Sequence, residues 1–332
     1  MLLKTISKRL FYFCRNYFYM RKILITLFLG VSSLLFGQAQ TIISDTTAEN
    51  PWKVRSNFGL NMTQSTFTNW AAGGRNNIAG SFLISAKANY TKDKFKWFNL
   101  LALGLGGIQY FEEGLEKTDD VIDFQSTLSY GLKNPWNIAG LIGFRTQFLD
   151  GFANPGDTVR ASTFMAPGYG NTSLGIEYQP SDNFRILASP LSGKFTFVSD
   201  EVLANQGAFG VEAAELDADE NVITPGRQFR AELGSYLRII YTKEIMKNID
   251  LNTRWEFFSN YLENPQNIDI NAELIMNFRV NEWFSASLQA NLIYDDDIKI
   301  TDRNGNVGPR TQFKQVIGLG IAYRLANYKK QD

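Results

Sequence analysis

The sequence contains no histidine, and its only cysteine is Cys14. The lack of histidine excludes Ser-His-Asp and Cys-His catalysis as well as zinc held by histidine. Beyond Cys14, no residue can form a disulfide, act as a thiol nucleophile or carry a lipid through cysteine. A lipid-modifying enzyme would need a Ser-Lys or carboxylate mechanism, and no residue spacing argues for one. We therefore expect no enzymatic activity and no cofactor.

An excess of one charge and long apolar runs are also missing. The chain of 332 residues has 33 basic and 33 acidic side chains, so it lacks the basic excess typical of nucleic-acid binding. After residue 40, no segment is apolar enough for a membrane-spanning helix. A transmembrane β-barrel is consistent with both features, because its strands alternate polar residues facing the lumen with apolar residues facing lipid.

The amino terminus has the pattern of a secretory signal. Arg21 and Lys22 precede the apolar run Ile23–Phe36, which is shorter than the roughly 20 residues of a spanning helix. Gly37–Ala39 then offers a cleavage site between small residues. Met20 stands directly before the basic pair, so we predict that it is the true start and that residues 1–39 comprise an overrun and a signal peptide. The alternative is a retained amino-terminal anchor.

One hairpin, Ile268–Asp295, shows the barrel alternation most clearly. In each arm, apolar residues occupy every second position and mostly polar residues lie between them. The apolar positions are Ile268, Ile270, Ala272, Leu274, Met276, Phe278 and Val280, then Phe284, Ala286, Leu288, Ala290, Leu292 and Tyr294. Each stripe matches the roughly 9–11 residues of a tilted strand that crosses a bilayer core. Trp283 and Tyr294 lie at the stripe ends, where aromatic residues mark the membrane interfaces.

The same pattern recurs along the chain and predicts an all-β fold. We expect a transmembrane antiparallel up-and-down β-barrel of about twelve strands over residues 52–326. Residues 40–51 would form a short periplasmic lead-in and residues 327–332 a periplasmic tail. Short turns alternate with longer loops, among them the charged segment Phe111–Asp119 and the acidic segment Asp200–Arg227. Because proline cannot donate to a strand ladder, a bulge or early strand end is expected at Pro190–Gly193.

Several short stretches are similar to a Bacteroidota outer-membrane family, domain of unknown function 3078. These stretches are Trp70–Gly74, Lys117–Asp120, Thr146–Phe148, Ser189–Lys194, Gly207–Gly210, Phe258–Tyr261 and Tyr294–Asp297. The resemblance implies a barrel and a location in the outer membrane of a Gram-negative bacterium. It implies no activity, ligand or site residue.

Charged residues on the polar faces of the strands are the candidate functional residues. They are Lys87, Arg145, Glu177, Arg185, Arg230, Glu232, Arg238, Arg254, Glu256, Glu273 and Arg279. A barrel of about twelve strands is narrow compared with open porins of 16–18 strands. Its inward charges could line a selective path, or they could pair into a network that fills the lumen. The sequence leaves both readings open.

A hard-cation site is a weaker hypothesis. Asp295, Asp297, Asp302 and Asn304 offer oxygen ligands of the kind that Ca²⁺ takes. Position twelve counted from Asp302 is a phenylalanine, so this segment is not an EF-hand. The acidic run Glu212–Glu220 is more typical of solvated surface than of a cation or partner site.

Two functional classes remain. The favoured class is a small-solute channel or transporter, integral to the outer membrane and surrounded by its lipid, with a charged lumen. The alternative is a closed structural or assembly barrel that binds a partner through its extracellular loops. No nucleic-acid partner is expected, and no residue pattern indicates an oligomeric state.

Overall fold

The computed structural model describes residues 50–66, 75–111, 114–152, 157–281, 283–301 and 305–327. The predicted signal, nearly all of the lead-in and the Trp70–Gly74 stretch lie outside these ranges. Twelve strands form the barrel: β1 (Trp52–Ser65), β2 (Asn77–Lys92), β3 (Phe95–Tyr110), β4 (Gly114–Lys133), β5 (Trp136–Thr146), β6 (Gly168–Ser181), β7 (Phe184–Phe197), β10 (Phe229–Met246), β11 (Ile249–Asn260), β12 (Asp269–Arg279), β13 (Phe284–Tyr294) and β16 (Gln312–Ala326).

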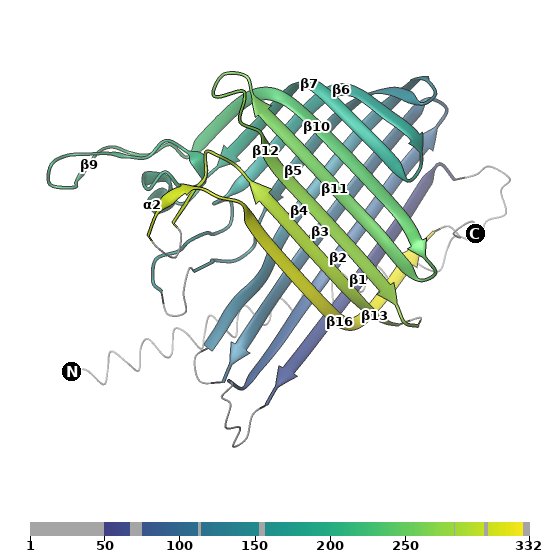
Figure 1. Cartoon of the computed structure of the whole chain (residues 1–332), viewed down its shortest axis with the longest axis horizontal. Coiled ribbons are helices and arrows are strands. Elements are labelled where there is room, and N and C mark those ends of the chain that lie inside the picture. Colours follow the sequence, from purple (N-terminus) through teal and green to yellow (C-terminus); the bar gives the residue numbers. More distant parts are fainter. Residues whose placement is uncertain are drawn as a thin grey trace. The chain divides into compact units, whose positions relative to one another are not determined.

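These strands close into one antiparallel barrel in the order β1-β16-β13-β12-β11-β10-β7-β6-β5-β4-β3-β2 (Figure 1). Each strand therefore pairs with its nearest barrel neighbours along the chain, and β1 pairs with β16 to complete the circle. The prediction of a twelve-stranded up-and-down barrel is confirmed. Two small hairpins lie outside the barrel: β8 (Glu215–Leu216) with β9 (Val222–Thr224), and β14 (Lys299–Thr301) with β15 (Val307–Pro309).

The outer wall is apolar because every second side chain of a strand points outward. Large hydrophobic side chains are exposed there, among them Ile142 at 60%, Leu174 at 54% and Ile317 at 71%. A monomeric soluble protein rarely exposes a continuous apolar surface of this extent, whereas a bilayer requires it. Since the strands have 11 to 20 residues, each is long enough to cross a bilayer core. The barrel is therefore a transmembrane one. No helix in the part of the chain that the structure describes is both long and apolar enough to span a bilayer.

Aromatic pairs surround one end of the barrel. Trp52 packs against Tyr90 with ring centroids 5.2 Å apart, and Trp136 packs against Tyr178 at 4.8 Å. Further pairs are Phe95 with Tyr130, Phe184 with Tyr241 and Trp283 with Phe284. All of these residues adjoin the shortest strand connections or the first strand's beginning, so they mark the level of one membrane interface.

The connections differ in length at the two barrel ends. At the short-turn end, two residues each join β2 to β3, β4 to β5, β6 to β7 and β10 to β11, and residues 280–283 join β12 to β13. At the long-loop end, residues 147–167 join β5 to β6, residues 198–228 join β7 to β10 and residues 295–311 join β13 to β16. The predicted alternation of short and long connections holds at these positions but not between β3 and β4, which are joined by residues 111–113 only.

Two predicted loops need correction. Of the segment Phe111–Asp119, residues from Gly114 onward belong to β4, where Leu115 and Glu116 pair with β3. The charged residues of this segment still pair as a strand, since β3 and β4 continue together as far as Tyr110 and Gly114. The segment Asp200–Arg227 is not only a loop, since it holds helix α2 (Glu201–Asn205), the 3₁₀ turn η1 (Ala208–Gly210) and the β8–β9 hairpin.

The predicted irregularity in β7 is present. The pairing of β7 with β6 shifts between Leu174 and Ile176, and its pairing with β10 shifts between Gly234 and Tyr236. Both shifts occur opposite Ser189–Leu191. The central residue of this segment, Pro190, has no amide hydrogen to donate to a neighbouring strand, so the regular pairing is interrupted there. Beside this bulge, residues of β7, β10 and β11 line a largely apolar groove of about 530 Å³.

Candidate functional site: the barrel interior

An ion-pair cluster centred on Arg254 crosses the middle of the lumen. From β11, the guanidinium of Arg254 donates to Asp123 on β4 at 2.8 Å. Four strands lie between β11 and β4 on one side of the barrel and six on the other, so this contact spans the lumen. Arg254 also lies 3.3 Å from Glu273, its pairing partner on β12, and 3.7 Å from Glu256.

A second set of bonds closes the lumen beside this cluster. Arg238 on β10 donates to Gln125 at 3.3 Å and to Thr127 at 2.9 Å, both on β4. The hydroxyl of Tyr236 donates to Glu256 at 2.5 Å. Arg238 is only 4% exposed. Solvent therefore has little access to the Arg238 guanidinium, which is held by neutral acceptors on β4.

The inner faces of β5, β6 and β7 complete a dry sector of the lumen. Ala139, Leu141 and Leu187 are 1–2% exposed and form an apolar cluster with Tyr236 and Phe258. Together with the Arg254 and Arg238 contacts, this packing lines the lumen from β4 round to β11. We call this part the dry sector.

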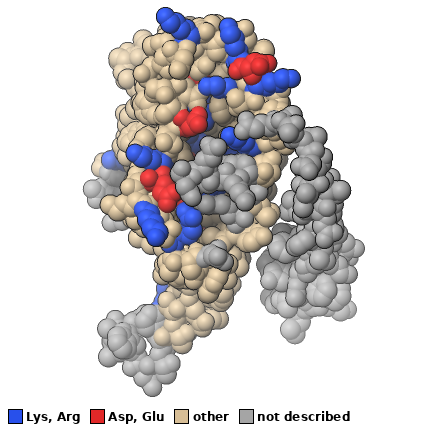
Figure 2. All heavy atoms as spheres, turned by 90° about the vertical axis from the view of Figure 1, so that its right-hand side faces the viewer, with Lys and Arg blue, Asp and Glu red and all other residues tan. Residues whose placement is uncertain are grey.

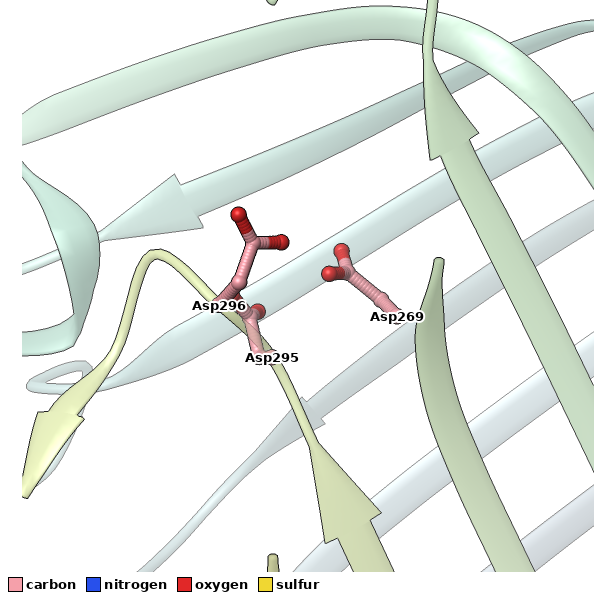
Figure 3. A group of neighbouring side chains, drawn as sticks. All are labelled: Asp269, Asp295 and Asp296. Carbon is pink, nitrogen blue, oxygen red and sulfur yellow. The ribbon is translucent and has the colours of Figure 1, made fainter. Parts of the chain in front are cut away.

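Toward the long-loop end, Lys194 holds a group of carboxylates together. Its ammonium lies 2.5 Å from Asp269, 2.7 Å from Asp295 and 3.7 Å from Glu232. Asp269, Asp295 and Asp296 approach one another from the ends of β12 and β13, as Figure 3 shows. Three carboxylates at this spacing could hold a cation, but Lys194 already supplies the compensating positive charge.

The residues of the predicted calcium site divide between different partners. Asp295 binds Lys194, whereas Asp297 accepts from Arg230 at 2.6 Å. Asp302 and Asn304 lie outside the described residues. The structure brings Asp269 toward Asp295 and Asp296, and sequence spacing alone did not indicate the place of Asp269 in this group.

Arg230 connects the barrel to the long loop between β7 and β10. Its guanidinium donates to the carbonyl of Gly210 at 2.9 Å and lies 3.4 Å from Glu232. The loop itself has a small apolar core, in which α2 packs Leu203 and Ala204 against Val198 and Val211. The loop is therefore a folded layer at this end.

Near the short-turn end, polar groups again reach across the interior. Lys96 on β3 donates to Gln179 on β6 at 2.9 Å. Glu177 is fully buried and accepts from Asn137 at 3.3 Å. The guanidinium of Arg185 lies 3.7 Å from the ring centroid of Phe98 on β3, and three strands separate β3 from β7.

The inner face of β1 and β2 differs from the dry sector. Arg55 and Lys87 lie directly opposite each other in the β1–β2 pairing, on the face that alternates with the exposed Val54. Ser81, Ser85 and Lys87 on the inner face of β2 are half-buried rather than buried. Arg55 is half-buried as well. Water therefore reaches this part of the lumen, which we call the wet sector.

The two remaining sequence candidates lie nearer the barrel ends. Arg279 pairs with Asp250 at 3.3 Å, and Arg145 is the pairing partner of Asp123. All eleven candidates thus lie on barrel strands. Arg55 and Lys194 are additional charges that the candidate set missed. Arg55 could have been identified from the sequence, because it alternates with the apolar, outward-facing residues of β1. Lys194 could not, because the bulge in β7 changes which residues of that strand point inward.

Exposed lysines gather near one end of the barrel, and exposed carboxylates lie in one long loop at the other. Lys53, Lys92, Lys94, Lys133, Lys243 and Lys247 are exposed beside the short turns or the ends of β1 and β10. At the long-loop end, the exposed residues Glu212, Glu215, Asp217, Asp219 and Glu220 belong to the segment that contains the β8–β9 hairpin. In Figure 2, which views the molecule from the right-hand side of Figure 1, blue basic side chains outnumber red acidic ones.

Comparisons with solved structures give only remote likenesses. An outer membrane channel from Pseudomonas putida aligns over 85% of this chain and 100% of its own, at 10% identity and a TM-score of 0.38. The translocator domain of the autotransporter NalP from Neisseria meningitidis aligns over 90% and 97%, at 9% identity and a TM-score of 0.34. Likeness at this level transfers no function to this chain.

No curated protein matches the chain. One family model does match, over residues 62–152, and its description is "Protein of unknown function (DUF3078)". The matched segment runs from β1 to just beyond β5. Over this part of the chain, the match agrees with the resemblance inferred from the sequence motifs.

Proposed function

We propose that this protein is an integral outer-membrane barrel that passes small solutes along the wet sector of its lumen. The observation that carries the proposal is the unequal burial of the interior. Many inward side chains from β4 round to β11, among them Asp123, Arg238 and Arg254, are buried and bonded across the lumen, whereas Arg55, Ser81, Ser85 and Lys87 on β1 and β2 are half-buried. Charges that have no ionic partner require water around them, so a hydrated path beside β1 and β2 accounts for both features.

The outer-membrane location is part of this proposal. The closed barrel, the unequal connections and the signal pattern in residues 20–39 all support it. The short-turn end would then face the periplasm and the long-loop end the exterior. The similarity to a Bacteroidota family leads us to infer a source in that phylum. Cell fractionation should recover the protein in the sarkosyl-insoluble envelope with heat-modifiable gel migration, and a soluble periplasmic pool would contradict this location.

Planar-bilayer recording tests the transport role. The purified folded protein should give a small, ohmic conductance, because the dry sector occupies much of a narrow lumen. Arg254→Leu should increase this conductance, since it removes the side chain that joins β11 to β4 across the lumen. Heat-modifiable migration of each sample provides the control for folding.

A second candidate function is favoured by the same cross-lumen contact. If the bonds from Arg254 to Asp123 and from Arg238 to Thr127 belong to a permanently closed interior, the barrel is structural and its folded loop layer binds a partner. In that case, neither the unaltered protein nor Arg254→Leu conducts ions while both remain folded. That result would refute the channel proposal.

A further inference from the structure

Three cationic side chains from three strands converge in the wet sector. Arg55 on β1 lies opposite Lys87 on β2 in the strand register. Arg185 reaches across from β7 and stacks on Phe98 of β3, whose pairing partner on β2 is Asn89, two residues from Lys87. Arg55 and Arg185 are also the two basic groups that act most strongly on the Lys87 ammonium. We call Arg55, Lys87 and Arg185 the basic triad.

Three carboxylates act on the triad without forming an ion pair with it. Glu273, the acidic group that acts on Lys87, lies 3.3 Å from Arg254. Glu177 and Asp182 act on Arg185, and Glu177 accepts its hydrogen bond from Asn137. Within the described ranges of the chain, no carboxylate lies within the 4 Å of an ion pair from any member of the triad.

This arrangement is costly for the empty protein. Like charges directly opposite on neighbouring strands destabilise a sheet. The Nε of Arg55 is buried and has no hydrogen-bond acceptor among the described residues, and an unpaired buried donor adds to that cost. An anion placed among the three side chains would remove both costs, since guanidinium and ammonium groups donate strong bonds to carboxylate and phosphate oxygens.

We propose that Arg55, Lys87 and Arg185 form a binding site for small solutes that carry a carboxylate or phosphate group. This inference rests on the proposed function, because it names the substrate class of the same hydrated path. The exposed lysines at the short-turn end would raise the local concentration of such anions at one entrance. The interior thereby selects cargo by charge.

Thermal unfolding with inorganic phosphate tests the site. Phosphate should raise the unfolding temperature of the full-length barrel in a saturable way, relative to chloride at equal ionic strength, because a ligand that binds only the folded state stabilises it. Lys87→Gln should weaken this response by roughly tenfold or more in phosphate concentration, as expected for the loss of one charge-assisted bond. Lys94→Gln, which removes the same charge from the β2–β3 turn, should respond as the unaltered protein does.

The unfolding temperature without phosphate provides an independent readout. Because Lys87 faces Arg55 without a carboxylate partner, Lys87→Gln should leave the ligand-free temperature unchanged or raise it. A lower ligand-free temperature, or an equal phosphate response in all three proteins, would overturn the proposed site. A barrel that binds phosphate but conducts no ions would overturn the proposed channel and keep the proposed site. A barrel that conducts ions but shows no phosphate response at Lys87 would overturn the site and keep the channel.

Discussion

Replacement of Arg254 tests the dry sector most sharply. The Arg254 side chain is 8% exposed and lies 2.8 Å from Asp123, 3.3 Å from Glu273 and 3.7 Å from Glu256. Arg254→Leu would leave these carboxylates without the guanidinium that compensates them. Removing one partner from a buried ionic group typically costs about 3–5 kcal/mol. We expect a loss within that range in the free energy of unfolding.

Arg279→Leu is the matched control. Arg279 is on the neighbouring strand β12 and forms an ion pair with Asp250 at 3.3 Å. Its side chain is 35% exposed, so solvent screens the pair and its loss should cost about 1 kcal/mol or less. Urea titration of the reversible folding of each barrel into lipid vesicles, followed by tryptophan fluorescence, would compare the two changes. Equal losses would refute the inference that the Arg254 cluster is buried and shielded from solvent.

Two further predictions concern the lipid face and the long-loop end. Leu274→Arg, at the centre of β12 on the lipid side, should cost about 2–4 kcal/mol in the same titration, and Asn277→Arg on the exposed lumen side should cost much less. Equal costs would mean that the assigned faces are wrong. Lys194→Met should loosen the long-loop end by leaving Asp269 and Asp295 to repel each other, so added protease should cut loops there faster. Unchanged cleavage would show that Lys194 does not hold these carboxylates together.

Alternation and loop length were sufficient to predict the fold. The side-chain period of two identified the faces of β12 and β13, because one face is nearly all apolar and the other polar. It also identified Glu273 as an inward residue, within reach of the inward charges Arg254 and Glu256 on the preceding strand. The strand register makes Arg254 and Glu273 paired residues of β11 and β12.

Contacts across the lumen were beyond prediction from sequence. Asp123 and Arg254 are more than one hundred residues apart, and their 2.8 Å contact depends on the curvature of the closed sheet. The phase change at the β7 bulge likewise obscured Lys194, because alternation does not continue through a bulge. The start of β4 was misplaced because the charges in residues 114–119 are typical of a loop in composition.

The most direct test of the central claim is the accessibility of two lumen-facing serines to a membrane-impermeant thiol reagent. Ser85 lies in the wet sector and is half-buried, whereas Ser129 on β4 has no exposed surface. Each would be changed to cysteine in a chain whose native Cys14 is replaced by serine. We predict rapid labelling of Ser85→Cys in the folded barrel and none of Ser129→Cys until the barrel is unfolded. Failure to label Ser85→Cys, or equal labelling of both, would contradict a lumen that is hydrated beside β1 and β2 and closed elsewhere.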